Sequence, residues 1–264
     1  MVNRLANVLC WLVLMVVLIV LGCQQKQVAD ASAYEPDVAE RVVAGTYATR
    51  AIRATGGYQS WLKTKSIELD CVATFYNADG SFYLTEQHHE VCPWLDSIRI
   101  SAREPQGRLV WQLSGESFRV LEANVPFGLL PTPIYARDFA EVVLNMTTAP
   151  IRFLDSRVEF DEALAPVRME GLWYYPIEKV SRDLKPYWSQ VTLYQNKDTS
   201  FVDIIWLADV EKDRYLTVRG YDYSKIDKKT LLVPTKIEIF KTNAKGVLQQ
   251  RLVTIDYYSL KSTE

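Results

Sequence analysis

The stretch Ile67-Glu68-Leu69-Asp70-Cys71-Val72-Ala73-Thr74-Phe75 decides the fold class of this chain. Apolar side chains occupy its odd-numbered positions, and polar ones occupy most of the even-numbered positions. Successive side chains of a β-strand point to opposite faces, so this alternation predicts a strand with one buried face. The turn sequence Asn77-Ala78-Asp79-Gly80 follows at once and predicts a hairpin.

Further strands of the same character occupy most of the chain. They are separated by short turn clusters, such as Asn196-Lys197-Asp198 and Asn243-Ala244-Lys245-Gly246, so neighbours in sequence should pair antiparallel. We predict these strands at residues 82–92, 97–102, 108–113, 116–121, 151–160, 167–180, 188–195, 200–207, 214–223, 233–241 and 247–258.

Two segments have the helical period instead. One begins at Pro36-Asp37, and Gly56-Gly57 ends it; a short turn of helix follows at residues 58–63. The second covers residues 134–146. Apolar side chains recur at helical spacing in both segments: Val38, Val42, Val43, Tyr47, Ala51 and Ile52 in the first, and Tyr135, Phe139, Val142, Val143 and Met146 in the second.

A meander of about a dozen strands is a large sheet, and open sheets beyond roughly ten strands tend to curl or split. We therefore predict a mainly β (α+β) protein. Its core is a strongly curved antiparallel sheet, a half-open β-barrel of about eleven strands, with the helices plugging the open side.

Composition narrows the class of protein. The chain has 264 residues, which suits one domain or at most two small ones. Its formal net charge is -2, so there is no basic surplus to support nucleic-acid binding. The sequence contains 7 Trp and 15 Tyr, side chains that suit the wall of a cavity or an interface.

The N-terminus has the pattern of an export signal. Arg4 precedes an uncharged apolar run from Val8 to Leu21, which is too short for a comfortable membrane span of about 20 residues and fits the core of a signal peptide. Val20-Leu21-Gly22-Cys23 resembles the lipobox of bacterial lipoproteins. The alternatives are a plain transmembrane anchor and an ordinary secretory signal with an incidental cysteine.

The lipobox resemblance implies a domain organisation and a location. Residues 1–22 would be a lipoprotein signal peptide, Cys23 the lipidated first residue, and residues 23–36 a flexible polar tether before a domain at residues 37–264. The protein would be held in the cell envelope by its N-terminal lipid. Gln24, rather than Asp, follows the cysteine; in a diderm host this resembles the pattern sorted to the periplasmic face of the outer membrane.

Two further cysteines, Cys71 and Cys92, would remain in an oxidising compartment. They lie on consecutive predicted strands, and a tight turn at Asp79-Gly80 would place Cys71 opposite His88 instead of Cys92. A disulfide between them therefore needs a longer or bulged hairpin, because the two Cα atoms must come within about 7 Å. The alternative is two thiols that pack as small hydrophobes.

The order of elements resembles the LolA/LolB/LppX-like superfamily of envelope lipoproteins and lipoprotein carriers. The resemblance rests on the amphipathic N-terminal helix, Ala54-Thr55-Gly56-Gly57 and Trp61, the lysine-flanked entry to the first strand at Ser66-Ile67, and the long meander interrupted by a helix. It implies a half-open barrel whose hydrophobic cavity holds acyl chains and is closed by helices.

Catalytic patterns are missing from the sequence. His88 and His89 are the only histidines; as neighbours on a strand they point to opposite faces and cannot chelate one metal ion together. Glu86, His88 and Glu90 share a face, which we interpret as a solvated strand surface instead of a metal site. The sequence also lacks a phosphate-binding Gly-rich loop and a nucleophile elbow. We predict a protein that is not an enzyme and needs no cofactor or metal.

The leading hypothesis is a lipid-anchored envelope protein that binds or transfers a lipid or the acyl chains of another lipoprotein. The helices around Val42 and Phe139 would act as lids. The rival hypothesis is a structural lipoprotein with a filled core that docks another envelope component. Large aromatic residues are the candidates for the cavity wall, or else for an ordinary core: Trp61, Phe139, Trp173, Tyr175 and Trp188.

The lipidation hypothesis predicts the behaviour of Cys23→Ala. This variant should lose its acyl chains and accumulate as an uncleaved precursor, because the signal peptidase cuts before the modified cysteine. Mass spectrometry of the membrane fraction measures both effects. Unchanged processing of Cys23→Ala would contradict the lipobox interpretation.

Overall fold

The computed structural model describes residues 47–104, 107–123, 133–154, 158–161, 165–181, 186–226 and 230–264. The chain divides into two compact units, Met1–Ala39 and Glu40–Glu264, and every described residue belongs to the second. The predicted signal peptide, Cys23 and the tether lie outside the described residues, as do Val38, Val42 and Val43 of the predicted first helix.

The described residues contain three α-helices and thirteen strands. The helices are α3 (Tyr47–Ala54), α4 (Tyr58–Lys63) and α5 (Ala136–Arg152). The strands are β1 (Ser66–Tyr76), β2 (Phe82–Cys92), β3 (Ser97–Glu104), β4 (Gly107–Ser114), β5 (Ser117–Ala123), β6 (Val158–Asp161), β7 (Val167–Met169), β8 (Leu172–Ser181), β9 (Gln190–Asn196), β10 (Val202–Asp209), β11 (Arg214–Lys225), β12 (Leu232–Thr242) and β13 (Leu248–Thr263). Short 3₁₀ turns lie at η2 (Pro93–Leu95) and η3 (Val210–Lys212).

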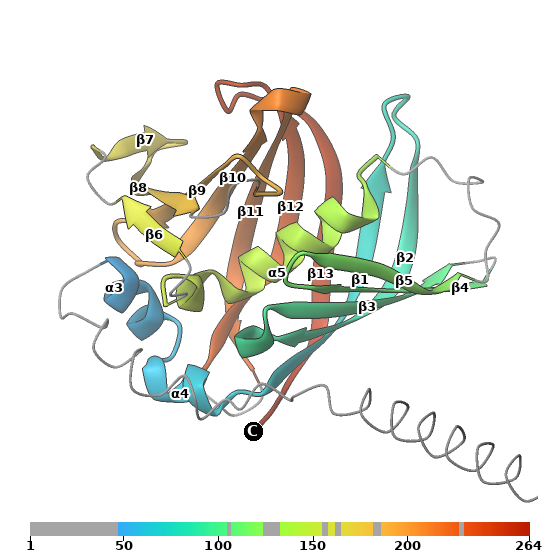
Figure 1. Ribbon diagram of the computed structural model, residues 1–264, viewed down its shortest axis with the longest axis horizontal. Coiled ribbons are helices and arrows are strands. Elements are labelled where there is room, and N and C mark those ends of the chain that lie inside the picture. The colour runs from blue at the N-terminus through green and yellow to red at the C-terminus, as the bar shows by residue number, and fades with distance from the viewer. Residues whose placement is uncertain are drawn as a thin grey trace, which may run out of the picture. The chain divides into compact units, whose positions relative to one another are not determined.

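All thirteen strands form one antiparallel sheet (Figure 1). Its order is β5-β4-β3-β2-β1-β13-β12-β11-β10-β9-β8-β6, and β7 pairs with another part of β8. Almost every pairing joins neighbours in sequence, as short connections predict. There are two exceptions. β6 pairs with β8 at the edge of the sheet, and in the middle the first strand pairs with the last: Ile67 lies opposite Ser262 and Phe75 opposite Val253.

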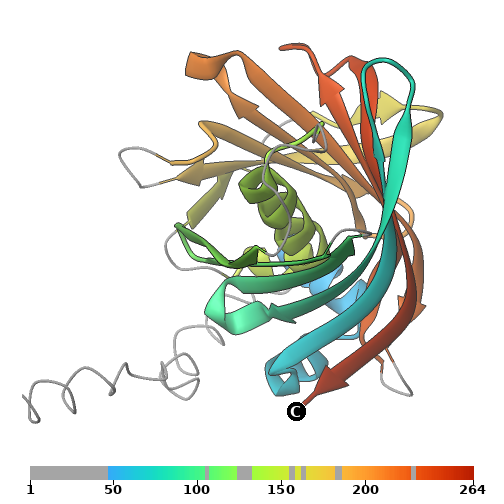
Figure 2. The same ribbon diagram turned by 90° about the vertical axis from the view of Figure 1, so that its right-hand side faces the viewer.

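The sheet curls around α5, which lies on its concave side (Figure 2). The alternation of β1 explains which face is inside, because Ile67, Leu69, Cys71 and Ala73 are fully buried while the side chains between them are half-buried. The predicted mainly β fold with a strongly curved antiparallel sheet and a helix on its open side is therefore confirmed.

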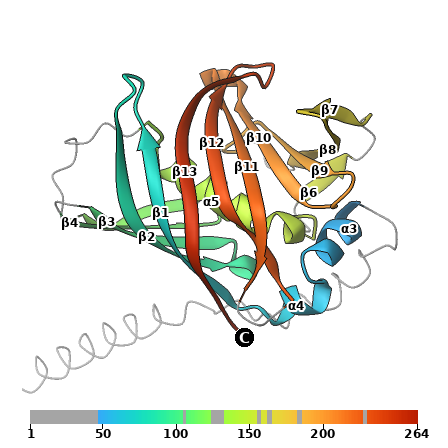
Figure 3. The ribbon, with the colours of Figure 1, turned by 180° about the vertical axis from the view of Figure 1, so that it is seen from behind.

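Helices α3 and α4 lie at one end of the sheet, near the C-terminal end of β13 (Figure 3). The predicted stop at Gly56-Gly57 is confirmed: the Gly57 amide donates to the carbonyl of Ile52 at 2.8 Å, and Gly56 has a φ of 115°. Only glycine adopts that conformation readily. The backbone also approaches Thr230 so closely that a Cβ at Gly56 would lie 2.5 Å from its carbonyl oxygen.

The predicted strand at residues 151–160 is wrong over its first part. Helix α5 continues to Arg152 even though Pro150 lies inside it, and only Val158–Asp161 is a strand. Pro150 sits in the last turn, where it removes one backbone hydrogen bond. Thr148 and Ile151 are buried there, and the Thr148 hydroxyl donates to the Leu144 carbonyl at 2.6 Å. Tertiary packing therefore outweighs the helix-breaking tendency of proline.

The predicted single strand at residues 167–180 is instead the hairpin β7–β8. Glu170 and Gly171 both have positive φ, 51° and 89°, which are the backbone angles of a two-residue hairpin turn. Met169 consequently pairs with Leu172. This division adds one strand to the twelve predicted segments, which gives the thirteen strands observed, compared with the predicted barrel of about eleven.

Close packing at Gly56 gives a test of the turn between α3 and α4. Gly56→Ala should lower the free energy of unfolding by about 3 kcal/mol or more, because the new Cβ meets the Thr230 backbone and the left-handed conformation adds strain. The matched variant is Gly80→Ala, where φ is 84° and no atom lies within 4 Å of the added Cβ; it should cost about 1 kcal/mol. Urea denaturation measures both, and equal losses would contradict the packing argument.

Candidate functional site

Helix α5 fills the concavity of the sheet. Its buried residues include Phe139, Val142, Val143 and Met146, and it contacts β3 and β4 on one side and β10, β11 and β12 on the other. These are four of the five residues of the predicted apolar face; the fifth, Tyr135, precedes the helix and is exposed. The helix therefore bridges the two arms of the curved sheet.

Phe139 lies at the centre of this packing. Its ring centroid is 5.5 Å from that of Phe75, 6.0 Å from that of His89 and 6.4 Å from that of Trp111. Its side chain is 1 % exposed. Phe139 therefore anchors α5 to the wall of the half-barrel.

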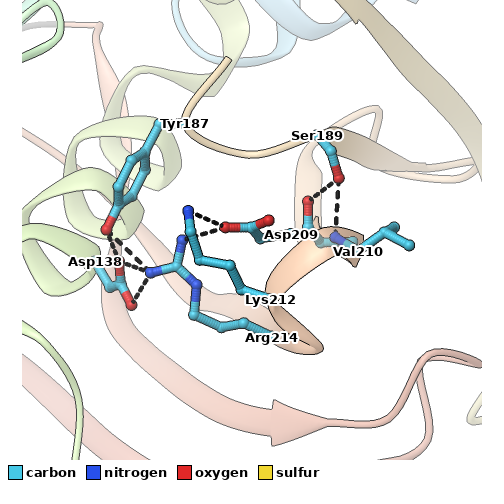
Figure 4. Close-up of polar contacts among 8 residues, drawn as sticks. Asp138, Tyr187, Ser189, Asp209, Val210, Lys212 and Arg214 are labelled. Atoms are coloured by element: carbon cyan, nitrogen blue, oxygen red, sulfur yellow. Dashed lines mark hydrogen bonds and ion pairs between the residues drawn. The ribbon is translucent and has the colours of Figure 1, made fainter. Parts of the chain in front are cut away.

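The first turn of α5 carries a buried carboxylate, Asp138, which is 2 % exposed (Figure 4). The Tyr187 hydroxyl donates a hydrogen bond to its Oδ1 atom. Arg214 Nη1, from the start of β11, donates to Oδ1 at 2.8 Å and to Oδ2 at 2.9 Å. We call this group of Asp138, Tyr187 and Arg214 the latch.

The surroundings of Arg214 hold its guanidinium group in place. Its Nη2 atom donates to Asp209 Oδ2 at 3.1 Å, and Lys212 Nζ donates to the same oxygen at 2.8 Å (Figure 4). The guanidinium carbon lies 4.2 Å from the Trp188 ring centroid and 4.8 Å from that of Tyr187. Arg214 therefore combines charge pairing with cation–π contacts.

The electrostatics of the latch follow from its burial. Burial raises the pKa of Asp138, and the hydrogen bond from Tyr187 and the charge of Arg214 oppose that shift. Burial and the neighbouring Asp138 carboxylate raise the pKa of Tyr187 to about 12. Tyr187 is therefore a hydrogen-bond donor at neutral pH, and Arg214 supplies positive charge that favours the ionised form of Asp138.

The other end of α5 is held by a second ion pair. Arg152 Nη1 pairs with Asp96 Oδ1, which follows η2, and Arg152 Nε donates to Thr148 Oγ1 at 3.0 Å. Both side chains of the ion pair are largely buried. Polar contacts thus tie α5 to opposite arms of the sheet, at Arg214 and at Asp96.

The concave wall also contains a chain of buried polar groups. Gln87 Nε2 donates to Thr85 Oγ1 at 2.8 Å. The amide oxygen Oε1 of Gln87 can only accept, so His89 Nε2, which lies 2.8 Å from it, is the donor. His89 Nδ1 therefore accepts from the Tyr257 hydroxyl at 3.0 Å. Burial lowers the pKa of His89 to about 3, so its imidazole is neutral. His88 faces the opposite side, as predicted, and pairs with Asp70 at 2.7 Å.

The five predicted cavity residues do not come together in one site. Trp61 and Trp188 are buried, and Trp61 Nε1 donates to Thr55 Oγ1 at 3.0 Å. Tyr175 packs on Tyr47 of α3 with ring centroids 4.7 Å apart, whereas Trp173 is 47 % exposed. Phe139 belongs to α5, and Trp188 contacts Arg214 of the latch. Trp61 belongs to α4, and Tyr175 contacts α3. Trp173 lies on the protein surface.

Cys71 and Cys92 are free thiols, which corrects the disulfide alternative. Cys71 lies opposite Gln87, one residue from the predicted position at His88. Cys92 is five positions further along β2, about 17 Å at the usual rise per residue. Burial raises the pKa of the Cys71 thiol far above its ordinary value, so the group is inert.

Two hollows are formed entirely by described residues. One, of about 450 Å³, is lined by residues of β1 to β4 and β13 that include Asp70, His88 and Arg103. The other, of about 360 Å³, is lined by residues around β8, β10 and β11 that include Tyr174, Asp203 and Arg219. His88 precedes His89, whose ring contacts Phe139 of α5, and Arg219 precedes Gly220, which faces Met146 of α5. Neighbours on a strand point to opposite faces, so both hollows lie on the convex face.

Asp138 is the functional candidate that the sequence analysis missed. It stands four residues before Val142 and eight before Met146, so it belongs to the apolar stripe of α5. A carboxylate in such a stripe requires a buried partner. That signal was present in the sequence, but it could not identify Tyr187 or Arg214 as the partners.

Among the described residues, no group of three or more His, Cys, Asp or Glu side chains could hold a metal ion. Within the same residues, no helix has the length and apolar character needed to cross a bilayer.

Solved structures resemble this half-barrel. A LolA superfamily protein from Nitrosomonas europaea, NE2245, matches with a TM-score of 0.56 over 82 % of this chain and 92 % of that one, at 14 % identity. The chain shares the fold of a LolA superfamily protein. The predicted resemblance is therefore confirmed at the level of fold.

Two further structures match less well. A DUF1329 family protein from Desulfovibrio piger gives a TM-score of 0.48 at 13 % identity, covering 82 % of this chain and 91 % of that one. A putative outer membrane lipoprotein-sorting protein domain from Vibrio parahaemolyticus gives 0.46 at 10 % identity, covering 88 % and 93 %. No protein-family model matches the chain, and no curated protein matches it.

The latch predicts a large effect of Arg214→Met. Removing the cation leaves Asp138 buried without its counter-charge, so the free energy of unfolding should fall by about 3–5 kcal/mol. Asp138→Asn in the same chain should restore part of the loss, because it removes the uncompensated charge. Urea denaturation at pH 7 measures the single and double variants.

The matched control is Arg251→Met. Arg251 pairs with Glu238 at 3.1 Å but is 48 % exposed, so its loss should cost less than about 1 kcal/mol. Equal losses for Arg214→Met and Arg251→Met would show that the latch is no stronger than a surface ion pair.

Proposed function

We propose that this protein is a lipid-anchored envelope protein whose half-barrel binds the acyl chains of a lipid or of another lipoprotein. Cys23 carries the anchor, and the residues before Tyr47 connect it to the barrel. In a diderm host, Gln24 favours the periplasmic face of the outer membrane. Binding and release are passive, with no catalytic step or cofactor.

The observation that carries this proposal is a concave apolar sheet that, in the described part of the chain, is covered mainly by α5. The wall of the sheet contributes fully buried apolar side chains such as Leu69, Ile205 and Ile237. Acyl chains that replaced α5 on this wall would move from water to an apolar surface. This transfer is favourable by about 0.8 kcal/mol of free energy for each CH₂ group that is buried. The shared fold with a LolA superfamily protein supports the same reading.

Helix α5 is suited to be the movable part. It is bound to each arm of the sheet by a polar contact near its end, the latch at Asp138 and the Arg152–Asp96 pair. When the helix moves, water can replace its polar contacts. Acyl chains bound on the wall would cover the apolar side chains of the sheet that the helix leaves. We infer that opening begins at one of these ends.

A second candidate function has its own support. Phe139, Trp61 and Trp188 are packed against other side chains, and the two hollows described above lie on the convex face. A filled core of this kind favours a structural lipoprotein that docks another envelope component. The two functions differ in whether α5 leaves the wall.

Native mass spectrometry distinguishes these functions. A form that begins at Gln24 should co-purify with lipid and, after delipidation, should take up a fluorescent fatty acid. Tyr187→Phe should speed this uptake at least about five-fold. It leaves the ring in place but removes the hydroxyl that donates to Asp138 and accepts from Arg214 Nη1 at 3.0 Å, and one such hydrogen bond is worth about 1 kcal/mol.

Tyr223→Phe is the matched control. This variant likewise removes a tyrosine hydroxyl, which donates to the Val202 carbonyl at 2.8 Å. That hydrogen bond lies within the sheet and away from α5. Its uptake rate should equal that of the unmodified protein. A protein that neither carries lipid nor takes up the probe would exclude the acyl-binding function and favour the docking function.

A further inference from the structure

The convex hollow of about 360 Å³ has a composition unlike that of an ordinary sheet surface. Its lining residues come mainly from β8, β10 and β11. These strands belong to one arm of the sheet, where β9 lies between β8 and β10 (Figure 3). Its lining residues all belong to the described part of the chain. Four of them are aromatic, three are acidic and one is basic: Tyr174, Phe201, Tyr221 and Tyr223; Glu170, Asp203 and Asp222; and Arg219.

Two of the aromatic residues are stacked on each other. The rings of Phe201 and Tyr223 stack with their centroids 4.1 Å apart and an interplanar angle of 16°. The Tyr223 hydroxyl is engaged with the Val202 carbonyl at 2.8 Å, which fixes the ring. Tyr174, on β8, is 5 % exposed and borders the same space. An aromatic face carries partial negative charge and attracts cations.

The charges of the hollow do not balance. Arg219 pairs with Glu170 at 2.8 Å, and it also contacts Tyr221 and the Phe240 ring. That pair leaves Asp203 and Asp222 without a compensating cation among the residues that line the hollow. The hollow is therefore acidic at neutral pH and unsuited to an anionic ligand.

Asp203 is the more informative of the two carboxylates. Its described hydrogen-bond partner is the Asn196 amide, which donates to Oδ2 at 2.9 Å. Burial raises the pKa of Asp203 to about 6, and the hydrogen bond from Asn196 opposes that shift. A partly buried carboxylate without a cation destabilises the folded chain, and a bound cation would relieve this cost.

We propose that this hollow binds an organic ammonium group, with Asp203 as its counter-ion and the Phe201–Tyr223 stack and Tyr174 as its aromatic contacts. The volume suits a small molecule or a headgroup. A bare metal ion fits poorly, because the described residues provide no group of three or more ligands for one. The site lies on the convex face, so its occupation is independent of acyl binding beneath α5.

Calorimetric titration of the full chain in a nonionic detergent tests the proposal. Choline and tetramethylammonium should bind saturably at pH 7.5. The uncharged choline isostere 3,3-dimethylbutanol should bind at least about ten times more weakly, because it cannot pair with Asp203 or with the aromatic faces. Equal affinity for choline and 3,3-dimethylbutanol, or no binding of either cation, would overturn the proposal.

Two sources can supply an ammonium group, a free amine and a phospholipid headgroup. Glycerophosphocholine binding more tightly than choline would identify a headgroup as the source. Choline binding more tightly would identify a free cation, because the phosphate would then meet the acidic residues unfavourably. Either result supports the ammonium site.

Asp203→Asn separates loss of the ligand from loss of the fold. The variant should reduce choline affinity at least about tenfold, yet its melting temperature without ligand should rise by about 2–4 °C at pH 7, because the unpaired buried charge is gone. Phe201→Leu should reduce affinity about 3- to 30-fold. Asp70→Asn, which removes a carboxylate from the other hollow, should leave choline binding unchanged.

The pH dependence of binding gives an independent check. Choline affinity should fall as the pH drops through about 6, because protonated Asp203 carries no charge, and Asp203→Asn should abolish this dependence. Affinity independent of pH in the unmodified protein would contradict the role of Asp203. The other titratable or charged groups around the hollow are Glu170, Tyr174, Arg219, Tyr221, Asp222 and Tyr223.

Discussion

The burial of α5 against the concave face is the interaction on which the rest of the structure depends. A sheet of this width exposes a broad apolar surface on its inner side, and such a surface is unstable in water. Phe139 and its neighbours cover it from one helix that reaches both arms. The latch and the Arg152–Asp96 pair then fix the position of the helix along the sheet. Helix α3 also packs against α5, and the buried polar chain around His89 lies beside Phe139.

Most of the strands could be predicted because the sequence of each strand contains the pattern that identifies it. Apolar and polar side chains alternate along β1 because one face of the strand is buried. Turn residues mark the ends of neighbouring strands. The errors arose where a distant contact overrides a local signal. Pro150 reads as the end of a helix, but burial of Ile151 and Thr148 keeps the helix going. Glu170-Gly171 is a two-residue turn that a long apolar run concealed.

The candidate site was less predictable than the fold. Asp138, Tyr187 and Arg214 come from three separate segments, and nothing local to any one of them specifies the other two. Residue type predicted burial for Trp61, Phe139 and Trp188, but not which surface each would contact. The convex hollow of about 360 Å³ could not be predicted for the same reason. Tyr174, Asp203 and Arg219 line it because the order of the sheet brings β8, β10 and β11 into one arm. Sequence patterns determine which face a side chain occupies, whereas neighbours across the sheet depend on its order.

The pairing of β1 with β13 has a consequence for the way this chain folds. The centre of the sheet joins the first strand to the last, so contacts that are farthest apart in sequence lie in the middle of the structure. Proteins dominated by such long-range contacts fold slowly. Neither arm can be joined to the other until the 16 residues of β13 are available. A chain emerging from a ribosome would therefore stay without its central strand pair until the residues of β13 are released.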